Sequence, residues 1–564
     1  MNVPMNNDSS GVVRTASSPG LSGRATSSDV ISTTRRGSKS SWGRAAFACG
    51  LALVLATQAG CASGPKNPDD EWTEIRKSAQ SSSRENEVAA WLLLELLSPG
   101  GSPAEARKAR KRLDELKAEG LLAEFGRGLD DLAHGRPGPA GEAFFRSVVA
   151  ASRSEDERAP LIAWFAAQHT YELSSQSKDF GKRHHDEVER LLAEPGRIGF
   201  RAYATVVDLW MLEAAAVAEK DIETKIAKRL GCVSDVRIAG PFGLAAESEI
   251  LRSYAPEKRG PEPVSFDKQK YQTFVPHVLD VTRSGCDVDA DESVPDGVFY
   301  AESFVTVDAE HDVILTASGA FRLWVDDQLV LDRDPRQWGI WPKFGVRARL
   351  APGKHRLLWK LSNPSTSLRV VRPDGRPLAV SASSEPGDGY ALDKVRVGAD
   401  PNELMRFIKS GHVEAPDDVV TRFLAAYLAD FEGQPDVATV IFEPLVKEPN
   451  RATGIALVTA AGFVEGDPIY DATQTRDLVH ELEVRAVERD GALLAPQLRS
   501  AIWESNQKGT VAAVEPLEKL VAAYPDVPNL HYTLAHVYEE LGWGPELERV
   551  VRRIIDQFPD SPDA

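Results

Sequence analysis

The cysteines are the residues of this chain whose number and spacing bear most directly on chemistry. There are four of them in 564 residues, at positions 49, 61, 232 and 286. So few cysteines exclude a scaffold held by many disulfides and a protein with several zinc sites. In an oxidising compartment Cys232 and Cys286 could form a disulfide, and two separate buried thiols are the alternative. Their separation along the chain does not decide, because a disulfide requires Cα atoms within about 7 Å.

Three alternating aspartates could bind calcium. Asp287, Asp289 and Asp291 are spaced like the start of a calcium-binding loop. An EF-hand also needs Gly at the sixth position and Glu at the twelfth, where this chain has Glu292 and Val298. The EF-hand is therefore excluded. A looser calcium site in a loop of a β-domain and a solvated acidic loop both remain open.

Other catalytic or metal-binding patterns are missing from the sequence. The run from His184 to Glu187 places two histidines side by side, and on a helix their side chains diverge by about 100°, so they do not easily share one metal ion. There is no phosphate-binding P-loop, no H-E-x-x-H and no G-x-S-x-G. We therefore expect a protein that is not an enzyme, with no cofactor and no resident metal.

Tryptophans gather between residues 324 and 359. Trp338 and Trp341 lie in a Trp-Gly-Ile-Trp stretch that we expect to be a loop, where exposed rings could stack on sugars. Packing of both rings beneath a long loop is the alternative. Trp324 and Trp359 lie in the middle of expected strands and are predicted to be core residues.

Residues 1–60 have the pattern of a secretory leader. Basic residues precede a short apolar run at 45–56, which is below the roughly 20 residues that span a membrane. Ala59 and Gly60 before Cys61 resemble a bacterial lipobox, although Gln58 replaces the usual Leu. The resemblance implies cleavage before Cys61, its diacylation and, with Ala62 next, an outer-membrane address. A plain signal peptide or one short membrane anchor are the alternatives.

The elements that must position these residues fall into three blocks. After a linker at 61–69, residues 70–230 show apolar residues at helical spacing, for example between Val88 and Leu94 and between Leu113 and Leu122. Proline and glycine clusters separate these runs. The pattern predicts a helical repeat domain of stacked helical hairpins.

In residues 232–395 the sequence pattern differs: apolar and polar positions alternate, and turn residues are frequent. This pattern predicts an all-β sandwich. The run from Ser318 to Leu361 (SGAFRLWVDD … LAPGKHRLLWKL) resembles the β-sandwich named after the anthrax protective antigen, a family that includes carbohydrate binders. Upstream, VRIAGPFG (236–243) and YAPE (254–257) resemble envelope proteins that combine tetratricopeptide repeats, such a sandwich and a transglutaminase-like domain. That enzyme domain needs a Cys, and none follows residue 395.

Residues 400–564 are again helical in pattern. Phe558-Pro559 follows Tyr524-Pro525 at the 34-residue period of tetratricopeptide repeats, with two amphipathic helices expected between them. The fold class expected from the whole sequence is multidomain α + β, with an α-solenoid of tetratricopeptide-like hairpins flanking a central all-β sandwich.

Charge and composition restrict the partners. The formal net charge of −18 argues against binding to nucleic acid or anionic lipid. The leading hypothesis is a bacterial envelope lipoprotein, anchored by its lipid in the outer membrane, whose repeats act as a scaffold that binds protein or peptide partners. One alternative is binding of carbohydrate or cell wall through the sandwich. Another is a truncated envelope protein whose enzymatic domain lies beyond residue 564.

Overall fold

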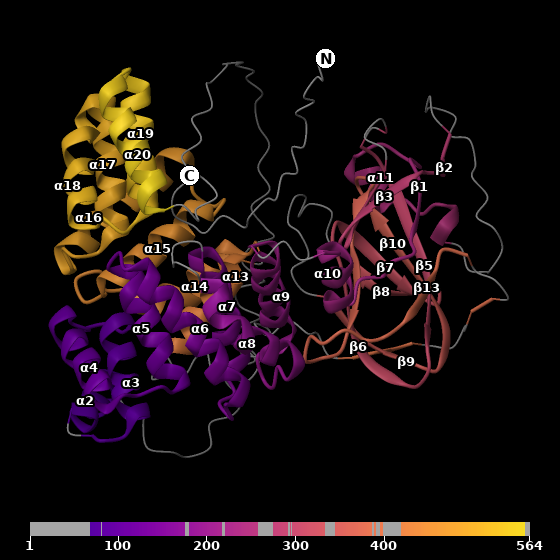
Figure 1. Ribbon diagram of the computed structural model, residues 1–564, viewed down its shortest axis with the longest axis horizontal. Helices are drawn as coiled ribbons and strands as arrows, with labels where there is room; N and C mark the ends of the chain where they lie inside the picture. Colours follow the sequence, from indigo (N-terminus) through magenta and orange to yellow (C-terminus); the bar gives the residue numbers. More distant parts are fainter. Residues whose placement is uncertain are drawn as a thin grey trace, which may run out of the picture.

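Figure 1 shows the computed structural model of the chain. The structure describes residues 68–80, 82–174, 180–216, 220–257, 275–290, 294, 296–332, 345–385, 389–390, 395–398, 419–431 and 433–558. Within these ranges the protein combines α-helices with antiparallel sheets, so the expected mixture of α and β structure is confirmed.

The first part of the chain is helical, as predicted. Its helices are α2 (Pro68–Gln80), α3 (Glu85–Leu97), α4 (Pro103–Leu116), α5 (Leu121–Ala133), α6 (Pro137–Arg153), α7 (Ala159–Ser174), α8 (Phe180–Ala193), α9 (Gly199–Ala216) and α10 (Ile222–Leu230). Pro103 and Pro137 occupy the first turn of α4 and α6, where a missing N–H costs no helical hydrogen bond. The expected apolar run from Leu113 to Leu122 is not one helix, because Lys117 takes a left-handed conformation and ends α4.

The middle of the chain forms the β-region. Its strands are β1 (Arg237–Gly240), β2 (His277–Val278), β3 (Val281–Ser284), β4 (Asp287–Ala290), β5 (Phe299–Val307), β6 (His311–Ala317), β7 (Ala320–Val325), β8 (Gln328–Asp332), β9 (Val346–Leu350), β10 (Gly353–Leu361), β11 (Ser365–Thr366), β12 (Leu368–Val371), β13 (Ser381–Ser383) and β14 (Arg396–Val397). Short helical turns, α11 (Glu247–Leu251) and η1 (Ala255–Glu257), follow β1.

Two antiparallel sheets dominate this region. The larger has the order β2-β1-β5-β10-β7-β8, with β13 also paired to β5, and the smaller has the order β12-β6-β9-β14. Apolar side chains of both sheets, such as Trp359 of β10 and Leu315 of β6, share one core. The open sheets with a common core are consistent with the predicted β-sandwich. A third small sheet has the order β11-β4-β3.

The last part of the chain returns to helices. They are α13 (Val419–Phe431), α14 (Pro435–Val446), α15 (Gly454–Gly466), α16 (Ala472–Arg489), α17 (Leu494–Lys508), η2 (Thr510–Ala513), α18 (Val514–Ala523), α19 (Pro528–Leu541) and α20 (Gly544–Gln557). The two helices expected between the aromatic-proline pairs are α19 and α20.

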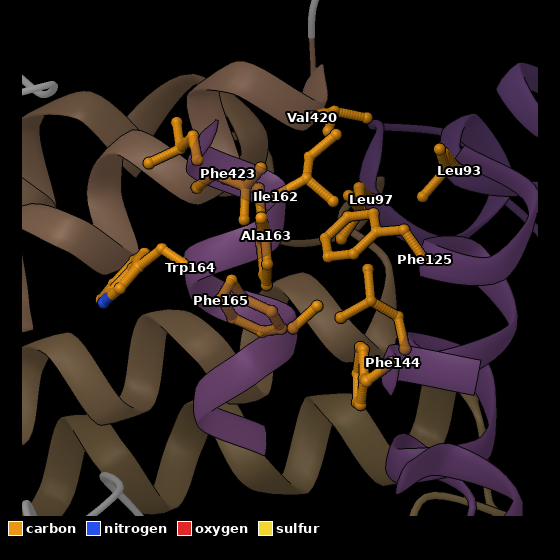
Figure 2. Packing of buried hydrophobic residues seen from close by; sticks show 14 of the residues in the cluster. Leu93, Leu97, Phe125, Phe144, Ile162, Ala163, Trp164, Phe165, Val420 and Phe423 are labelled. Atoms are coloured by element: carbon orange, nitrogen blue, oxygen red, sulfur yellow. The ribbon is translucent and has the colours of Figure 1, made fainter. Parts of the chain in front are cut away.

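The helical core runs across the blocks expected from the sequence. Buried residues of α2 to α10 and of α13 to α16 belong to one apolar cluster, which we call the main helical core. Figure 2 shows Phe423 of α13 beside Phe165 of α7, and their ring centroids are 5.6 Å apart. The β-region therefore lies, in the sequence, between two sets of helices that share the main helical core.

The helices α17 to α20 have a separate, smaller core, which includes Leu498, Leu517, Leu530 and Leu534. We call these four helices the C-terminal arm, and Figure 1 draws its last helices in yellow, away from the sheets.

Candidate functional site

Several residues singled out in the sequence lie outside the described ranges. Cys61, Trp338, Trp341 and Asp291 belong to this group. Lipidation at Cys61 and sugar stacking by the two tryptophans therefore stay predictions.

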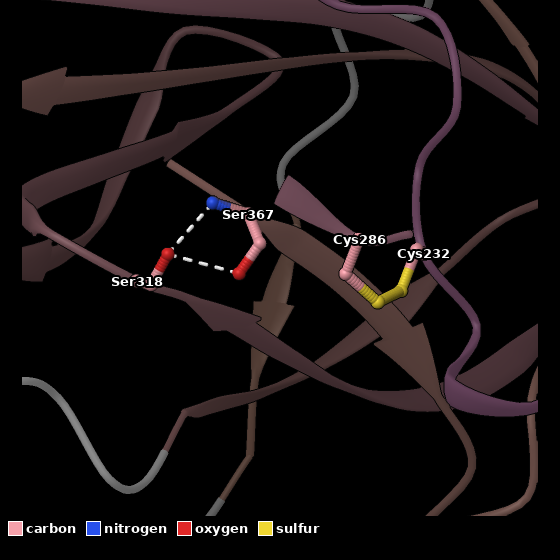
Figure 3. The surroundings of a disulfide bond; sticks show 4 residues. All are labelled: Cys232, Cys286, Ser318 and Ser367. Atoms are coloured by element: carbon pink, nitrogen blue, oxygen red, sulfur yellow. Dashed lines mark hydrogen bonds between the residues drawn. A yellow bond between two sulfur atoms is a disulfide. The ribbon is translucent and has the colours of Figure 1, made fainter. Parts of the chain in front are cut away.

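The structure joins Cys232 and Cys286 in a disulfide, with Cα atoms 5.4 Å apart (Figure 3). Cys232 follows α10 and forms an isolated bridge to Arg369 of β12, while Cys286 precedes β4. Both cysteines pack against the main helical core. The bond therefore ties the last helix before the β-region to the hairpin of β3 and β4.

Asp287 and Asp289 lie on strand β4 rather than in the expected loop. Burial and the nearby Asp289 carboxylate raise the pKa of Asp287, although Arg369 opposes this shift. In the described part of the chain, no group of three or more His, Cys, Asp or Glu side chains is placed to hold a metal ion.

Trp324 and Trp359 are buried, as predicted. The nearby hairpin between β7 and β8 turns at Asp326 and Asp327, which both have positive φ. The buried Asp326 carboxylate lies 2.6 Å from Nδ1 of His355 and accepts a 2.9 Å hydrogen bond from the backbone N–H of Arg356. Asp326 of the Val-Asp turn and His355 of the Pro-Gly-x-His run thus form one buried contact within the sandwich-like motif.

A charged cluster on the outer face of the larger sheet was not foreseen. Arg356 donates to Glu302 at 2.6 Å and to Asp327 at 2.5 Å, and its Nη2 donates to the carbonyl of Pro256 at 2.9 Å. Lys360 pairs with Glu257 at 2.9 Å. These buried charges are paired, so they hold the segment around α11 and η1 on the sheet rather than offering reactive groups.

The candidate functional site is an apolar cavity of about 290 Å³ among the helices. It is lined by α5, α6 and α7, by α13 and α15, and by the arm helices α17 and α19. Its walls are mostly aliphatic and aromatic: Leu129, Leu132, Phe165, Leu173, Phe423, Ile455, Val458, Leu494, Leu498, Val527 and Leu530. The cavity therefore lies where the main helical core meets the C-terminal arm.

A few polar groups reach this cavity. The ring of Tyr427 lies 4.8 Å from that of Phe165, and burial raises the pKa of its hydroxyl. The ring of His169 lies 4.3 Å from that of Phe165, and its Nδ1 is 3.1 Å from Oε2 of Glu172. Both polar side chains are thus fixed by aromatic neighbours, as in pockets that use a few groups to orient an apolar ligand.

The wall nearest the arm depends on a glycine. Gly135, between α5 and α6, has φ +66°, and a Cβ there would lie 2.8 Å from the ring of Tyr524. Tyr524 in turn donates a 2.9 Å hydrogen bond to the carbonyl of Ala492. A larger residue at position 135 would be strained at this φ and would have to displace the side chains of Tyr524 and Leu494.

Comparison with protein-family models, with curated proteins and with solved structures finds no match to this chain. No helix of the described ranges is long and apolar enough to cross a membrane.

Sequence reasoning missed the apolar cavity. Its lining comes from segments as distant as Leu129 and Leu530. Each segment has the periodicity of an ordinary core helix, so no local signal marks it as a wall of a cavity.

Proposed function

We propose that this protein is a lipoprotein of the bacterial cell envelope, anchored through Cys61, that binds other proteins and is not an enzyme. In this proposal the helices form a tetratricopeptide-like scaffold, and the outer membrane is its location. The single observation that carries the binding role is the apolar cavity between the main helical core and the C-terminal arm.

The cavity favours one kind of contact. Seven helices bring apolar side chains to it, and a partner that inserts an aromatic or aliphatic side chain would remove both surfaces from water. Burial of one such side chain stabilises a complex by about 1.5–3 kcal/mol. Anchor residues that fill a pocket dominate the affinity of many interfaces. The proposed partner is therefore a protein segment that carries a Phe, Leu or similar anchor.

The repeat assignment rests on the arm. The helices α19 and α20 lie between the aromatic-proline pairs that recur at the 34-residue period. The ring of Tyr538 on α19 stacks on that of Trp543 at a centroid distance of 5.9 Å, at the tight connection between the two helices. Helical hairpins of this kind bind peptides on their concave faces.

The anchoring claim is tested by Cys61→Ser in the full-length chain, with Cys49→Ser as the matched control. Cells are labelled with a fatty acid that carries an alkyne, and membranes are then separated from soluble protein. We expect Cys61→Ser to lose the label and to leave the membrane fraction, while Cys49→Ser keeps both. Unchanged label and membrane retention of Cys61→Ser would refute lipid anchoring.

The binding role is tested by filling the cavity. Val458→Trp places a large ring in it, and Val440→Trp makes the same change on the exposed side of α14, where Val440 is 70% exposed. Proteins crosslinked to each variant in cells are compared with those of the unmodified protein, after circular dichroism confirms folding.

We expect at least one crosslinked protein to be retained by Val440→Trp and reduced tenfold or more by Val458→Trp. Ile455→Phe, a smaller filling change, should reduce the same protein to a lesser degree. Identical crosslinked proteins for all variants would reject the cavity as the binding site.

A further inference from the structure

A second cavity, of about 270 Å³, lies between the helices and the sheets. Its helical side comes from α7, α9, α10 and α13, and its other side comes from β6, β12 and the turn at Gly375. We call it the interdomain cavity. Ligand sites are common at such junctions, and typical small-molecule pockets have volumes of about 300–1,000 Å³, so this one suits a small ligand.

The charged groups of the interdomain cavity are mainly basic. Arg201 of α9 and Arg369 of β12 line it together with one carboxyl group, that of Asp208. Arg201 is only 7% exposed. The carboxylate of Asp287 on β4 also interacts electrostatically with Arg369. Two guanidinium groups therefore line this one cavity.

Burial disfavours the charged forms of Asp208 and Arg369, which both line this cavity. Burial raises the pKa of Asp208 to about 6, although Arg369 opposes the shift. Burial also lowers the pKa of Arg369. Guanidinium groups stay charged at any physiological pH, and that of Arg201 is largely shielded from water, so an anion entering the cavity would meet two cations.

Four aromatic residues also line this cavity. Trp164, Phe200, Tyr203 and Phe431 line the cavity, and the guanidinium of Arg201 lies 5.5 Å from the ring centroid of Phe200. The turn at Gly375 closes one side tightly, since a Cβ there would lie 2.5 Å from Cβ of Tyr203. Flat apolar groups stack well between such rings.

We propose that the interdomain cavity binds a small carboxylic acid with a flat aromatic body. The carboxylate pairs with the guanidinium groups of Arg369 and Arg201, for which the planar fork of arginine provides two parallel hydrogen bonds. The aromatic body lies among Trp164, Phe200 and Phe431. Because helices and sheets both contribute, the bound acid joins the two parts of the molecule.

Equilibrium dialysis of the full-length protein tests this proposal. The probes are benzoate, phenylacetate and indole-3-acetate, each compared with its neutral amide. We expect one saturable equivalent of at least one of these acids per chain, with binding of its amide at least tenfold weaker. Failure of all three acids to bind the folded protein overturns the proposal.

Variants locate the binding. Arg369→Met removes one cation, and Ala204→Phe fills the cavity but leaves both arginines in place. Arg347→Met is the matched control, because Arg347 lies on β9 at the surface beside Asp312. We expect a tenfold or greater loss of affinity for the first two variants and none for the control.

The cavity-filling variant Ala204→Phe decides whether the acid binds in the interdomain cavity. Equal binding by Ala204→Phe and the unmodified protein would show that the acid binds elsewhere, which overturns the proposal even if Arg369→Met fails to fold. This result is independent of the partner-binding role, because that role is tested by substitutions at Val458 and Ile455, which line the apolar cavity and not the interdomain cavity.

Discussion

The main helical core and the C-terminal arm are built from similar helices but are completed in different ways. The core includes α13 to α16, which follow the β-region in the sequence, and among them α13 packs on α3 and α7 while α15 packs on α3. The arm closes on itself with consecutive helices. The difference is visible in single helices: α7 is buried almost all round, whereas only Ile554 of α20 is buried.

This contrast teaches that neighbours in sequence are not always partners in a core. A helix that is apolar all round must be enclosed, and α7 is covered by its neighbours α6 and α9 and, on a further side, by aromatic residues of α13. A helix with one apolar stripe needs only one neighbour. We therefore expect the arm to unfold separately from the main helical core.

The largest expected effect comes from Phe165→Ala. Phe165 is almost fully buried between Phe125 and Phe423, so its loss should lower the free energy of unfolding by about 3–5 kcal/mol. Hydrogen exchange should accelerate in α3 to α9 and α13 to α16 and stay unchanged in α18 to α20. Ile555→Ala, at a half-exposed position of α20, is the control and should change stability by less than about 0.5 kcal/mol. Equal acceleration in the arm would mean one cooperative unit.

A smaller loss of stability is expected for Leu517→Ala, and it should affect the C-terminal arm instead of the main helical core. Leu517 is fully buried in the arm, and its truncation should cost about 2–3 kcal/mol of the arm's own stability. Exchange should accelerate in α17 to α20 alone. Acceleration in α7 or α13 would contradict the separation.

His134→Ala tests the boundary between the two regions, with an expected loss of about 2 kcal/mol at neutral pH. His134, at the end of α5, lies 3.2 Å from Asp130 and 3.0 Å from Asp490, which follows α16. Burial disfavours the charged ring, but the hydrogen bonds to Asp130 and Asp490 outweigh it and raise the pKa of His134 to about 10.

The pH dependence has a definite sign. Because the pKa is higher in the folded state than the ordinary 6.5, the stabilisation is complete below pH 6.5 and is lost as the pH rises towards 10. Urea unfolding at several pH values should show the difference between the unmodified protein and His134→Ala shrinking over this range. A constant difference would show that His134 acts by packing alone.

The smallest effect is expected for Tyr538→Phe in the arm. The hydroxyl of Tyr538 donates a 2.6 Å hydrogen bond to Glu518, which joins α19 to α18. Its removal should cost about 1 kcal/mol. The same substitution in a Glu518→Gln background should cost less, and a full additive loss would argue against the bond.

Local patterns of the sequence predicted much of the fold. Turn residues such as Asp326-Asp327 and alternation along β5 to β10 placed the strands, since both act over a few residues. The helices α19 and α20 followed from the repeat. Lys117 shows a limit, because an apolar spacing carries no information on a left-handed residue that interrupts it.

Such local patterns could not predict the candidate site. The apolar cavity unites residues such as Leu132, Phe423 and Leu530, and the interdomain cavity unites Arg201 with Arg369. Pairings across hundreds of residues depend on packing of whole elements, which periodicity does not encode. The disulfide partners were identifiable only because cysteines are so few.

The interruption of the main helical core by the β-region has a consequence for biogenesis. When α7 leaves the ribosome, α13 has not been made, and Phe165 and Trp164 lack their partners Phe423 and Phe431. At about 5–20 residues per second, the stretch between Ser174 and Val419 takes roughly 12–50 s to synthesise. Throughout that interval the nascent chain exposes these apolar side chains. We therefore expect chaperones that bind unfolded chains to hold it.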